Sequence, residues 1–223
     1  MDPSDNTKTC VQFIVLHAFE PFTISPVLKV KLDRSTASTP PLSLPDMIIL
    51  KVFDRIFAHD FRAWFDAAEL TQGFEEQFRF FLTNGAANKS LDEWQTERKT
   101  AHKSRKEHPP LETEAFLRTL LSSYHDNATM TYKRLPSYQG NYISIFYDRV
   151  KFVPQLDQPD TLDISVSGIL FEYIEGRTLS SLPASIVSND ICLACVDIVN
   201  ACGDAGVINS DVRLEGFIVP TVS

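Results

Sequence analysis

The run MIILKVF, Met47–Phe53, is apolar at every position except Lys51 and is rich in residues that favour strands. The segment before it, Val27–Leu32, alternates between aliphatic residues and lysines. A stretch rich in Ser, Thr and Pro lies between the two, so we expect two antiparallel strands joined by an irregular loop. An amine on an apolar strand face needs a route to water or an anionic partner. Lys51 is therefore either a lysine that reaches water at a sheet edge or a residue that binds an anion.

Apolar residues at helical spacing predict helices elsewhere in the chain. The predicted helices span residues 60–82, 112–124 and 188–203, and further strands are predicted at 11–16, 142–147 and 164–174. Ser188 suits the N-cap of the last helix. An order of strands, an interposed helical block, more strands and a helix is typical of the α+β class. We therefore expect an α+β fold with an antiparallel sheet.

Charge and composition exclude some classes of function. The chain has 21 Lys and Arg against 29 Asp and Glu, which gives a net charge of −8 at pH 7. An acidic surface repels phosphate backbones, so we expect no nucleic-acid partner. No apolar run approaches the roughly 18 residues that span a bilayer, and the polar start does not resemble a signal peptide. We expect a soluble intracellular protein, cytoplasmic or nuclear, with no membrane partner.

One segment departs from this acidic character. Arg98–Lys106 holds five basic side chains and no acidic one. A run of this kind is either the solvated face of a helix or loop, or a patch that directs nuclear import or contacts an anion. It lies in a stretch of the chain, about residues 60–110, that we interpret as an insertion.

Three of the four cysteines, Cys192, Cys195 and Cys202, cluster in the segment DICLACVDIVNACGDAG. A Cys-x-x-Cys pair can indicate metal or redox chemistry. Here no second pair and no nearby His completes a set of four zinc ligands. The segment has helical spacing, and a free thiol on the apolar face of a helix behaves as a small hydrophobe. We therefore expect the thiols to lie in the core and predict no metal site.

Two further segments carry candidate site residues. In GVINSDVRLEGFIV, Asp211 and Arg213 lie between two apolar strips after a helix. An aspartate in this position is commonly turn chemistry, but the same position presents a carboxylate that can accept a hydroxyl proton. The other segment, GILFEYIEGRTLSSL, begins at Gly168 and predicts a strand, a bend and a short turn. Each of these signals is weak by itself.

The order of these segments is more specific than any one of them. A strand lysine, a Leu-Phe-Glu-Tyr-Ile linker, a helix, a turn and Asp-Val-Arg follow one another, and this order resembles the divergent protein-kinase-like domains common in fungi. The matching stretches, from about Phe22 to the end of the chain, are FTISPVLKVKL, MIILKVFDRIFAHDFR, YKRLPSYQGNYISIFYDRV, GILFEYIEGRTL and GVINSDVRLEGFIV.

The resemblance implies roles for five residues. Lys51 would hold the phosphates of ATP, and the linker at Glu172 and Ile174 would bind its adenine through the backbone. In the catalytic segment Asp211 would accept the substrate hydroxyl proton, with Arg213 beside it. ATP is thus the implied cofactor.

The resemblance also implies a domain organisation of the protein-kinase-like kind. We expect a polar tail at residues 1–9. A small lobe with an antiparallel sheet and helices would span 10–170 and contain the inserted helical segment at about 60–110. The linker, with only the start of the large helical lobe, would span 171–223.

The chain departs from the family at parts that phosphoryl transfer needs together. Phe19–Pro26, which corresponds to the glycine-rich loop over the phosphates, contains no glycine. The helix carboxylate that pairs with the lysine is missing from Asn127–Met130, and Glu112 and Glu114 lie upstream of that position. Gly216 replaces a metal-binding asparagine, and no acid follows it to supply an Asp-Phe-Gly element. We therefore expect poor retention of Mg²⁺ and no efficient kinase activity.

In the family, the helix that corresponds to residues 188–203 is covered by further helices of the large lobe, and the chain ends before them. We therefore expect its apolar face to be exposed and to bind a protein partner or a second copy. The residues of this face are Ile191, Cys195, Ile198, Val199 and Cys202. Three interpretations follow: a non-catalytic pseudokinase that binds a partner, a residual ATP-dependent phosphotransferase, or a degenerate fragment without selected activity. The missing metal ligands disfavour the second.

Overall fold

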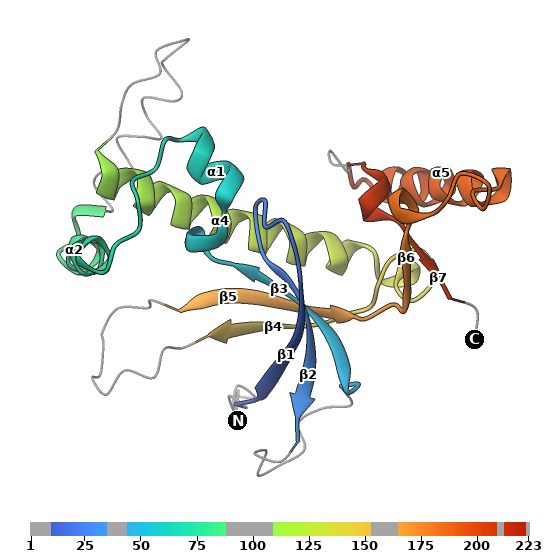
Figure 1. Cartoon of the computed structure of the whole chain (residues 1–223), viewed down its shortest axis with the longest axis horizontal. Coiled ribbons are helices and arrows are strands. Elements are labelled where there is room, and N and C mark those ends of the chain that lie inside the picture. The colour runs from blue at the N-terminus through green and yellow to red at the C-terminus, as the bar shows by residue number, and fades with distance from the viewer. Residues whose placement is uncertain (1–9, 35–43, 88–108, 153–164, 209–211, 222–223) are drawn as a thin grey trace, which may run out of the picture.

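The computed structural model describes residues 10–34, 44–87, 109–152, 165–208 and 212–221 (Figure 1). The strands in these ranges are β1 (Gln12–Phe19), β2 (Val27–Asp33), β3 (Met47–Phe53), β4 (Phe146–Phe152), β5 (Val166–Glu172), β6 (Gly176–Thr178) and β7 (Ile218–Pro220). The helices are α1 (His59–Trp64), α2 (Gln72–Thr83), α4 (Pro110–Arg134) and α5 (Asn189–Asp204). Short 3-10 turns lie at Arg55–Phe57, Pro136–Tyr138, Leu179–Ser181 and Leu214–Gly216.

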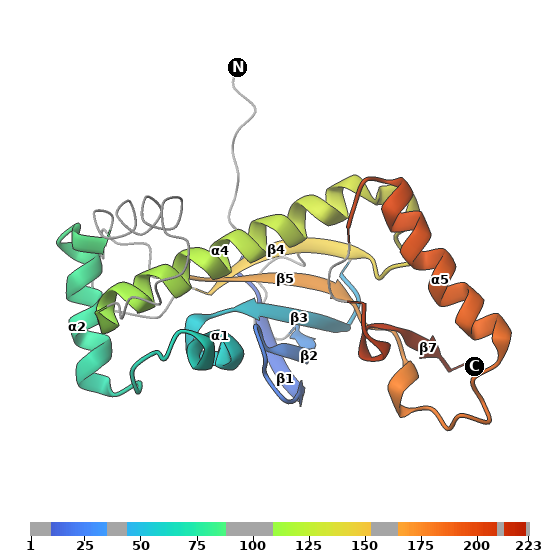
Figure 2. The ribbon, with the colours of Figure 1, turned by 90° about the horizontal axis from the view of Figure 1, so that it is seen from above.

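Five of the strands form one antiparallel sheet in the order β1-β2-β3-β5-β4, and β6 pairs with β7 in a separate two-stranded sheet. In Figure 1, β1 and β2 run steeply across the direction of β4 and β5, so the large sheet is strongly twisted. The helices between β3 and β4 lie over one face and one end of this sheet, whereas α5 and β7 lie beyond its other end (Figure 2). The α+β class and the antiparallel sheet expected from the sequence are confirmed.

One face of the large sheet packs the aliphatic half of each alternating strand. Val30 of β2 lies opposite Ile48 of β3, and Leu28 lies opposite Leu50. The buried cluster on this face consists of Val30, Leu32, Leu44, Ile48, Leu50 and Leu170. A slip of one residue in the strand pairing would move this whole set of side chains to the other face of the sheet. Such a slip is strongly unfavourable, because full burial of each of these side chains contributes about 1.5–3 kcal/mol. The alternation in the sequence therefore fixes the register.

The long helix α4 covers the other face of the sheet (Figure 2). It begins at Pro110, a residue that fits the first helical turn because no backbone N–H is needed there. Leu121 of α4 is 1% exposed and packs against Phe53 and Ile169 of the sheet. Side chains two residues apart share a strand face, so Lys51 points to the same side as Phe53.

The helical block differs from the sequence prediction. Residues 60–82, expected to form one helix, form α1 and α2, because the chain turns at Asp66, whose φ of 50° is left-handed. The hydroxyl of Thr71 then accepts a hydrogen bond of 3.2 Å from the backbone N–H of Phe74 and starts α2. By contrast, the helix predicted at 112–124 continues as α4 to Arg134. The strand predicted at 142–147 begins only at Phe146 and forms β4.

The last helix begins as predicted, but its thiols lie elsewhere than expected. Ser188 caps α5, and its hydroxyl accepts a hydrogen bond of 3.4 Å from the N–H of Ile191. The expectation that the thiols lie in the core is wrong, because Cys192 is exposed and Cys195 and Cys202 are only half-buried. The reason is the position of α5 beyond the end of the sheet, away from the buried clusters (Figure 1).

Candidate functional site

Lys51 lies on the α4 face of the large sheet. Its backbone is paired with Val27 of β2 on one side and Ile169 of β5 on the other. Because β3 is the central strand of the five, the interpretation of Lys51 as a lysine at a sheet edge is wrong. The side chain is half-buried, and its Nζ lies 5.6 Å from the ring centre of Phe53, within cation–π range.

The linker begins where β5 ends. Glu172 is the last residue of β5 and lies opposite Ile48 of β3. Its carboxylate accepts a hydrogen bond of 3.1 Å from the N–H of Ile145, and its own N–H donates to the Ile145 carbonyl at 2.8 Å. Lys51 lies three positions after Ile48 on β3, a distance of about 10 Å along a strand. Ile174, two residues after Glu172, is half-buried.

A second lysine lies between the sheet and the linker. Lys29 of β2 is the cross-strand partner of Ile49, so it shares a face with Lys51. Its Nζ lies 3.8 Å above the ring centre of Tyr173 in the linker. A contact of this geometry contributes about 0.5–2 kcal/mol, depending on how well water is excluded. In the sequence Lys29 is only one of the lysines that alternate with aliphatic residues in this strand, and no local pattern predicts its contact with Tyr173.

The linker is fastened to the segment that holds Arg213. Strand β6, which starts at Gly176, pairs with β7. A Cβ at Gly176 would lie 2.4 Å from the carbonyl oxygen of Val219, so only glycine permits this approach. The N–H of Thr221 donates to the Glu175 carbonyl at 3.0 Å and closes the same end. The linker and the C-terminal segment, which are separate in the sequence, are therefore in direct contact in the fold.

Of the two catalytic candidates, the structure describes one. Arg213 is exposed and precedes the 3-10 turn at Leu214–Gly216, where its carbonyl accepts a hydrogen bond of 3.0 Å from the N–H of Gly216. Asp211 lies outside the described residues, as does the basic run Arg98–Lys106. The structure therefore places Glu172, Ile174 and Arg213 toward one end of the large sheet and Lys51 in its centre.

The carboxylate of Glu114 on α4 is bound by two arginines. Its Oε2 lies 2.5 Å from Nη1 of Arg55, and its Oε1 lies 2.7 Å from Nη1 of Arg62. Glu114 is fully buried, and Arg55 also pairs with Glu75 of α2 at 2.5 Å and stacks on the ring of Phe78. Both oxygens of this carboxylate are thus occupied by guanidinium groups.

One segment of α4, Asn127–Met130, contains no acidic residue. Asn127–Met130, where the family resemblance places the lysine's partner, contributes Ala128 to the buried cluster. Thr129 is buried, and its hydroxyl donates to the His125 carbonyl at 2.9 Å. His125 itself packs edge-on against Phe53, with ring centres 5.4 Å apart.

The C-terminal end of α4 approaches both the linker side of the sheet and α5. Tyr132 packs against Phe146 and Phe171, and its hydroxyl lies 3.3 Å from that of Ser144. Burial raises the pKa of Tyr132 above its usual value of 10, and nearby Cys202 of α5 adds to this effect. Burial likewise raises the pKa of the Tyr147 phenol, helped by the charge of Glu172 beside it. Both phenols are therefore neutral near pH 7.

The segment without glycine between β1 and β2 is fastened to the rest of the fold. The carbonyl of Thr23 accepts a hydrogen bond of 2.9 Å from the N–H of Asp60 at the start of α1. The carbonyl of Pro26 accepts one of 2.9 Å from the N–H of Val52. Ile24 packs against the cluster under α4. This segment therefore belongs to the interface between the sheet and α1.

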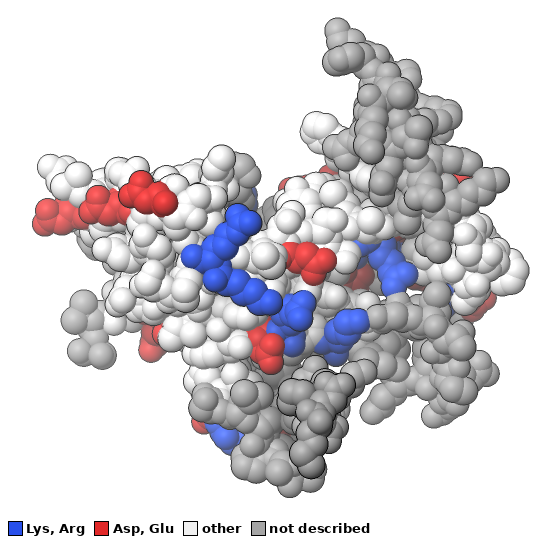
Figure 3. Space-filling view, turned by 180° about the vertical axis from the view of Figure 1, so that it is seen from behind, with Lys and Arg blue, Asp and Glu red and all other residues white. Residues whose placement is uncertain are grey.

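The exposed surface of α5 combines apolar and acidic side chains. The face expected to be exposed, from Ile191 to Cys202, is half-buried, whereas Leu193 is 60% and Val196 is 54% exposed. No residue of α5 is buried. Its aspartates recur every seven residues, at Asp190, Asp197 and Asp204, so they lie along one side of the helix. Figure 3 shows acidic side chains in a row there and basic ones in a diagonal row across the middle of the same view.

In the part of the chain that the structure describes, no three His, Cys, Asp or Glu side chains are grouped to hold a metal ion. Among the helices of these ranges, none is both long enough and apolar enough to cross a membrane.

Comparison with known proteins gives no further assignment. No protein-family model, no curated protein and no solved structure matches this chain.

Proposed function

We propose that this chain is a protein-kinase-like binding module that does not catalyse phosphoryl transfer, that is, a pseudokinase with a degraded ATP site. One observation carries the proposal. The buried carboxylate of the helix that covers the sheet, Glu114, is bound on both oxygens by Arg55 and Arg62. Catalysis in the family requires that a helix glutamate pairs with the strand lysine, here Lys51. A carboxylate held by two guanidinium groups does not serve that purpose.

The remaining geometry supports a binding site for a nucleotide on the Lys51 face. Lys29 and Lys51 supply positive charge on one face of the sheet, and Lys29 contacts Tyr173 of the linker that starts at Glu172. Phosphate groups prefer such paired cations, and an aromatic linker residue, Tyr173, offers a surface on which a base can stack. In this proposal the adenine lies against the linker at Glu172–Ile174 and the phosphates approach Lys51.

A thermal melt with ATP, with and without Mg²⁺, tests this proposal. We expect a cooperative melt, and ATP at about 100 times its Kd should raise Tm by about 5–10 °C. The shift should persist in EDTA, because the proposed site binds ATP through lysines and the linker and not through a metal ion. Lys51→Met should remove it, since this change keeps the length of the side chain and deletes the amine. Lys31→Met is the matched control, because Lys31 is an exposed lysine farther along β2.

Each alternative gives a different result in the same experiment. ATP consumption that requires Mg²⁺ and is lost in Asp211→Asn would replace the proposal with a phosphotransferase. A melt without cooperativity would favour a degenerate fragment. A cooperative melt that ATP does not move would contradict the nucleotide site.

The proposal includes a protein partner at α5. The exposed Leu193 and Val196 and the row of aspartates favour a partner surface that is both apolar and basic. Sedimentation over a range of concentrations tests whether this partner is a second copy. A dimer that Leu193→Asp disperses would identify α5 as a self-association surface, and a monomer at all concentrations would leave a different protein as the partner.

A further inference from the structure

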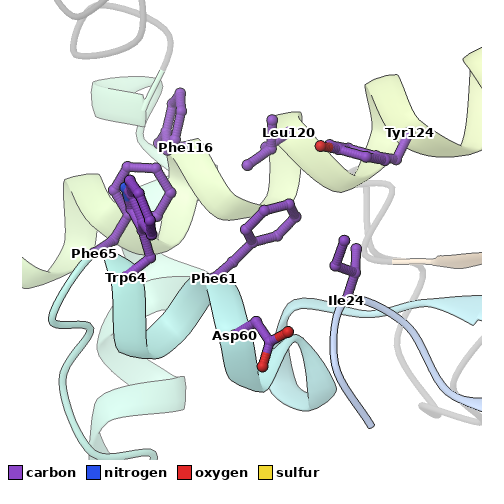
Figure 4. Close-up of a pocket in the computed structure, with 8 residues that line it drawn as sticks. All are labelled: Ile24, Asp60, Phe61, Trp64, Phe65, Phe116, Leu120 and Tyr124. Carbon is purple, nitrogen blue, oxygen red and sulfur yellow. The ribbon is translucent and has the colours of Figure 1, made fainter. Parts of the chain in front are cut away.

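A cavity of about 400 Å³ lies between α1 and the N-terminal half of α4, away from the linker. Figure 4 shows the side chains that line it, which come from both helices and from the segment between β1 and β2. The lining residues are Ile24, Asp60, Phe61, Trp64, Phe65, Phe116, Leu120 and Tyr124. Five of them are aromatic. A volume of this size is typical of sites for small molecules.

Helical spacing creates the aromatic walls. On α4, Phe116, Leu120 and Tyr124 follow one another at intervals of four residues and form a row along one side. The ring centre of Tyr124 lies 5.4 Å from that of Phe61 on α1. At the other end of the row, Phe116 packs edge-on against Phe65 at 5.1 Å. The two aromatic pairs thus flank Leu120 from opposite ends.

Hydrogen bonds and an ion pair hold α1 in its position relative to α4. Arg62 of α1 donates to Glu114 of α4 and to the Ala68 carbonyl. The N–H of Asp60 donates to the Thr23 carbonyl at 2.9 Å. These bonds fix α1 at a distance from α4 that the aromatic side chains only partly fill. A preformed cavity requires little ordering when it binds a ligand.

Asp60 gives the cavity its charge. Of the lining residues that the structure describes, it alone is ionisable to a charged form at neutral pH. None of the described lysines and arginines forms an ion pair with it. Figure 4 shows Asp60 at the edge of the cavity between Phe61 and Ile24. The site therefore joins one carboxylate to a wall of aromatic faces.

We propose that this cavity binds a small organic ammonium ion with an apolar body. The faces of aromatic rings carry negative partial charge and attract cations, and quaternary ammonium groups bind in this way. The Asp60 carboxylate also attracts a cation, and it would repel an anion. Ile24 and Leu120 provide apolar contact for the rest of the ligand.

Binding of benzyltrimethylammonium to the full chain tests this proposal. Its neutral isostere, neopentylbenzene, has the same shape without the charge. We expect the cation to shift amide signals of Phe61, Trp64 and Leu120 in a heteronuclear NMR titration, with a Kd in the millimolar range. The isostere should bind at least about threefold more weakly, the factor that a modest cation–π contact gives.

Two variants and one control assign the contacts. Asp60→Asn should raise the Kd for the cation about threefold, as expected for an exposed charge pair. Asp190→Asn should leave it unchanged, because Asp190 has the same position in the first turn of α5 but lies outside the cavity. Trp64→Ala should raise the Kd about tenfold, and folding tolerates it because Trp64 is 72% exposed.

The outcome that overturns the proposal is equally specific. Equal affinity for the two probes, an unchanged Kd in Asp60→Asn, or signal shifts confined to the face of Lys51 and Tyr173 would each rule out an ammonium site between α1 and α4. The ATP experiment tests the face of Lys51 and Tyr173. The result of the ammonium titration therefore neither supports nor contradicts the nucleotide proposal.

Discussion

Nη1 of Arg55 lies 2.5 Å from Oε2 of Glu114, and the two residues are 59 positions apart in the chain. Arg55 lies two positions after the end of β3, whereas Glu114 lies in the first turns of α4. Both side chains are buried, so their charges are removed from water and depend on each other. The ion pair therefore fastens α4 to the end of the central strand, and through Arg62 it fastens α1 to the same point.

Loss of Glu114 should destabilise the fold severely. Glu114→Ala leaves Arg62 without an anion and leaves Arg55 with Glu75 alone, and removal of one partner from a buried pair costs about 3–5 kcal/mol. Glu112→Ala, two residues earlier on the same helix, should cost less than about 1 kcal/mol, since Glu112 is half-buried and interacts with the helix dipole from the first turn. Urea unfolding followed by circular dichroism measures both. Similar losses in the two variants would contradict a special role for the ion pair.

Asp54 should make stability depend on pH in the acid range. Burial raises its pKa above 3.8, although the N–H of Ile56 and the charge of Arg55 oppose this. A raised pKa in the folded state means that the stabilising contribution is present at low pH and is lost as the pH rises through that pKa. Asp54→Asn keeps the acceptor for Ile56 and removes the charge. The variant should therefore be more stable than the native chain at pH 7, and this gain should shrink toward pH 3.

Thermal melts between pH 3 and 7 check this prediction. Asp148→Asn is the matched control, because the Asp148 carboxylate also accepts a hydrogen bond from a backbone N–H, that of Arg149, but stays in water. A gain for Asp54→Asn that does not change with pH would show that burial of the charge is not its cause.

The two long helices should differ sharply in their contribution to the core. Leu121 of α4 is 1% exposed, and Leu193 of α5 is 60% exposed. Leu121→Ala should cost about 2–5 kcal/mol, because it opens a cavity between α4 and the sheet. Leu193→Ala should cost no more than about 0.5 kcal/mol. Chemical unfolding of the two variants decides this, and a large loss for Leu193→Ala would show that α5 is covered in solution.

The four thiols should react at two rates. Burial raises the pKa of the Cys195 and Cys202 thiols above 9.0, so little thiolate forms at pH 8. Cys10 and Cys192 are exposed to the reagent. Peptide mapping after a short pulse of iodoacetamide should therefore show alkylation at Cys10 and Cys192 first. In urea the four rates should converge, and equal rates in the native chain would contradict the half-buried position of α5.

The sheet strands were readable from the sequence where the pattern was local and strong. The apolar run at Met47–Phe53 forms β3 with the same bounds, and the alternation after Val27 forms β2. Ser188 caps α5, a prediction that depends on one side chain and an N–H three residues away. The candidate site is a different matter, because the roles of Lys51, Glu172 and Ile174 come from a resemblance and stay predictions.

Other features required contacts between distant residues. One helix was expected at residues 60–82, yet α1 ends at Trp64 and the chain turns at Asp66, while Arg62 of α1 pairs with Glu114 of α4. Phe61, Trp64 and Phe65 have helical spacing in the sequence, but only the fold decided that Trp64 is exposed at the edge of a cavity. No local sequence pattern predicts that the amine of Lys29 lies over the ring of Tyr173.

The sequence by itself determined the positions of β2, β3 and β5, the start of α5, and which face of the large sheet is apolar. These properties depend on periodicity and on hydrogen bonds over a few residues, which every short segment carries. Tertiary structure alone decided that Glu114 pairs with Arg55 and Arg62 and that α1 and α4 line an aromatic cavity between them. Such contacts form only when chain segments more than fifty residues apart are brought together. A charge that is then buried away from water requires an opposite charge beside it.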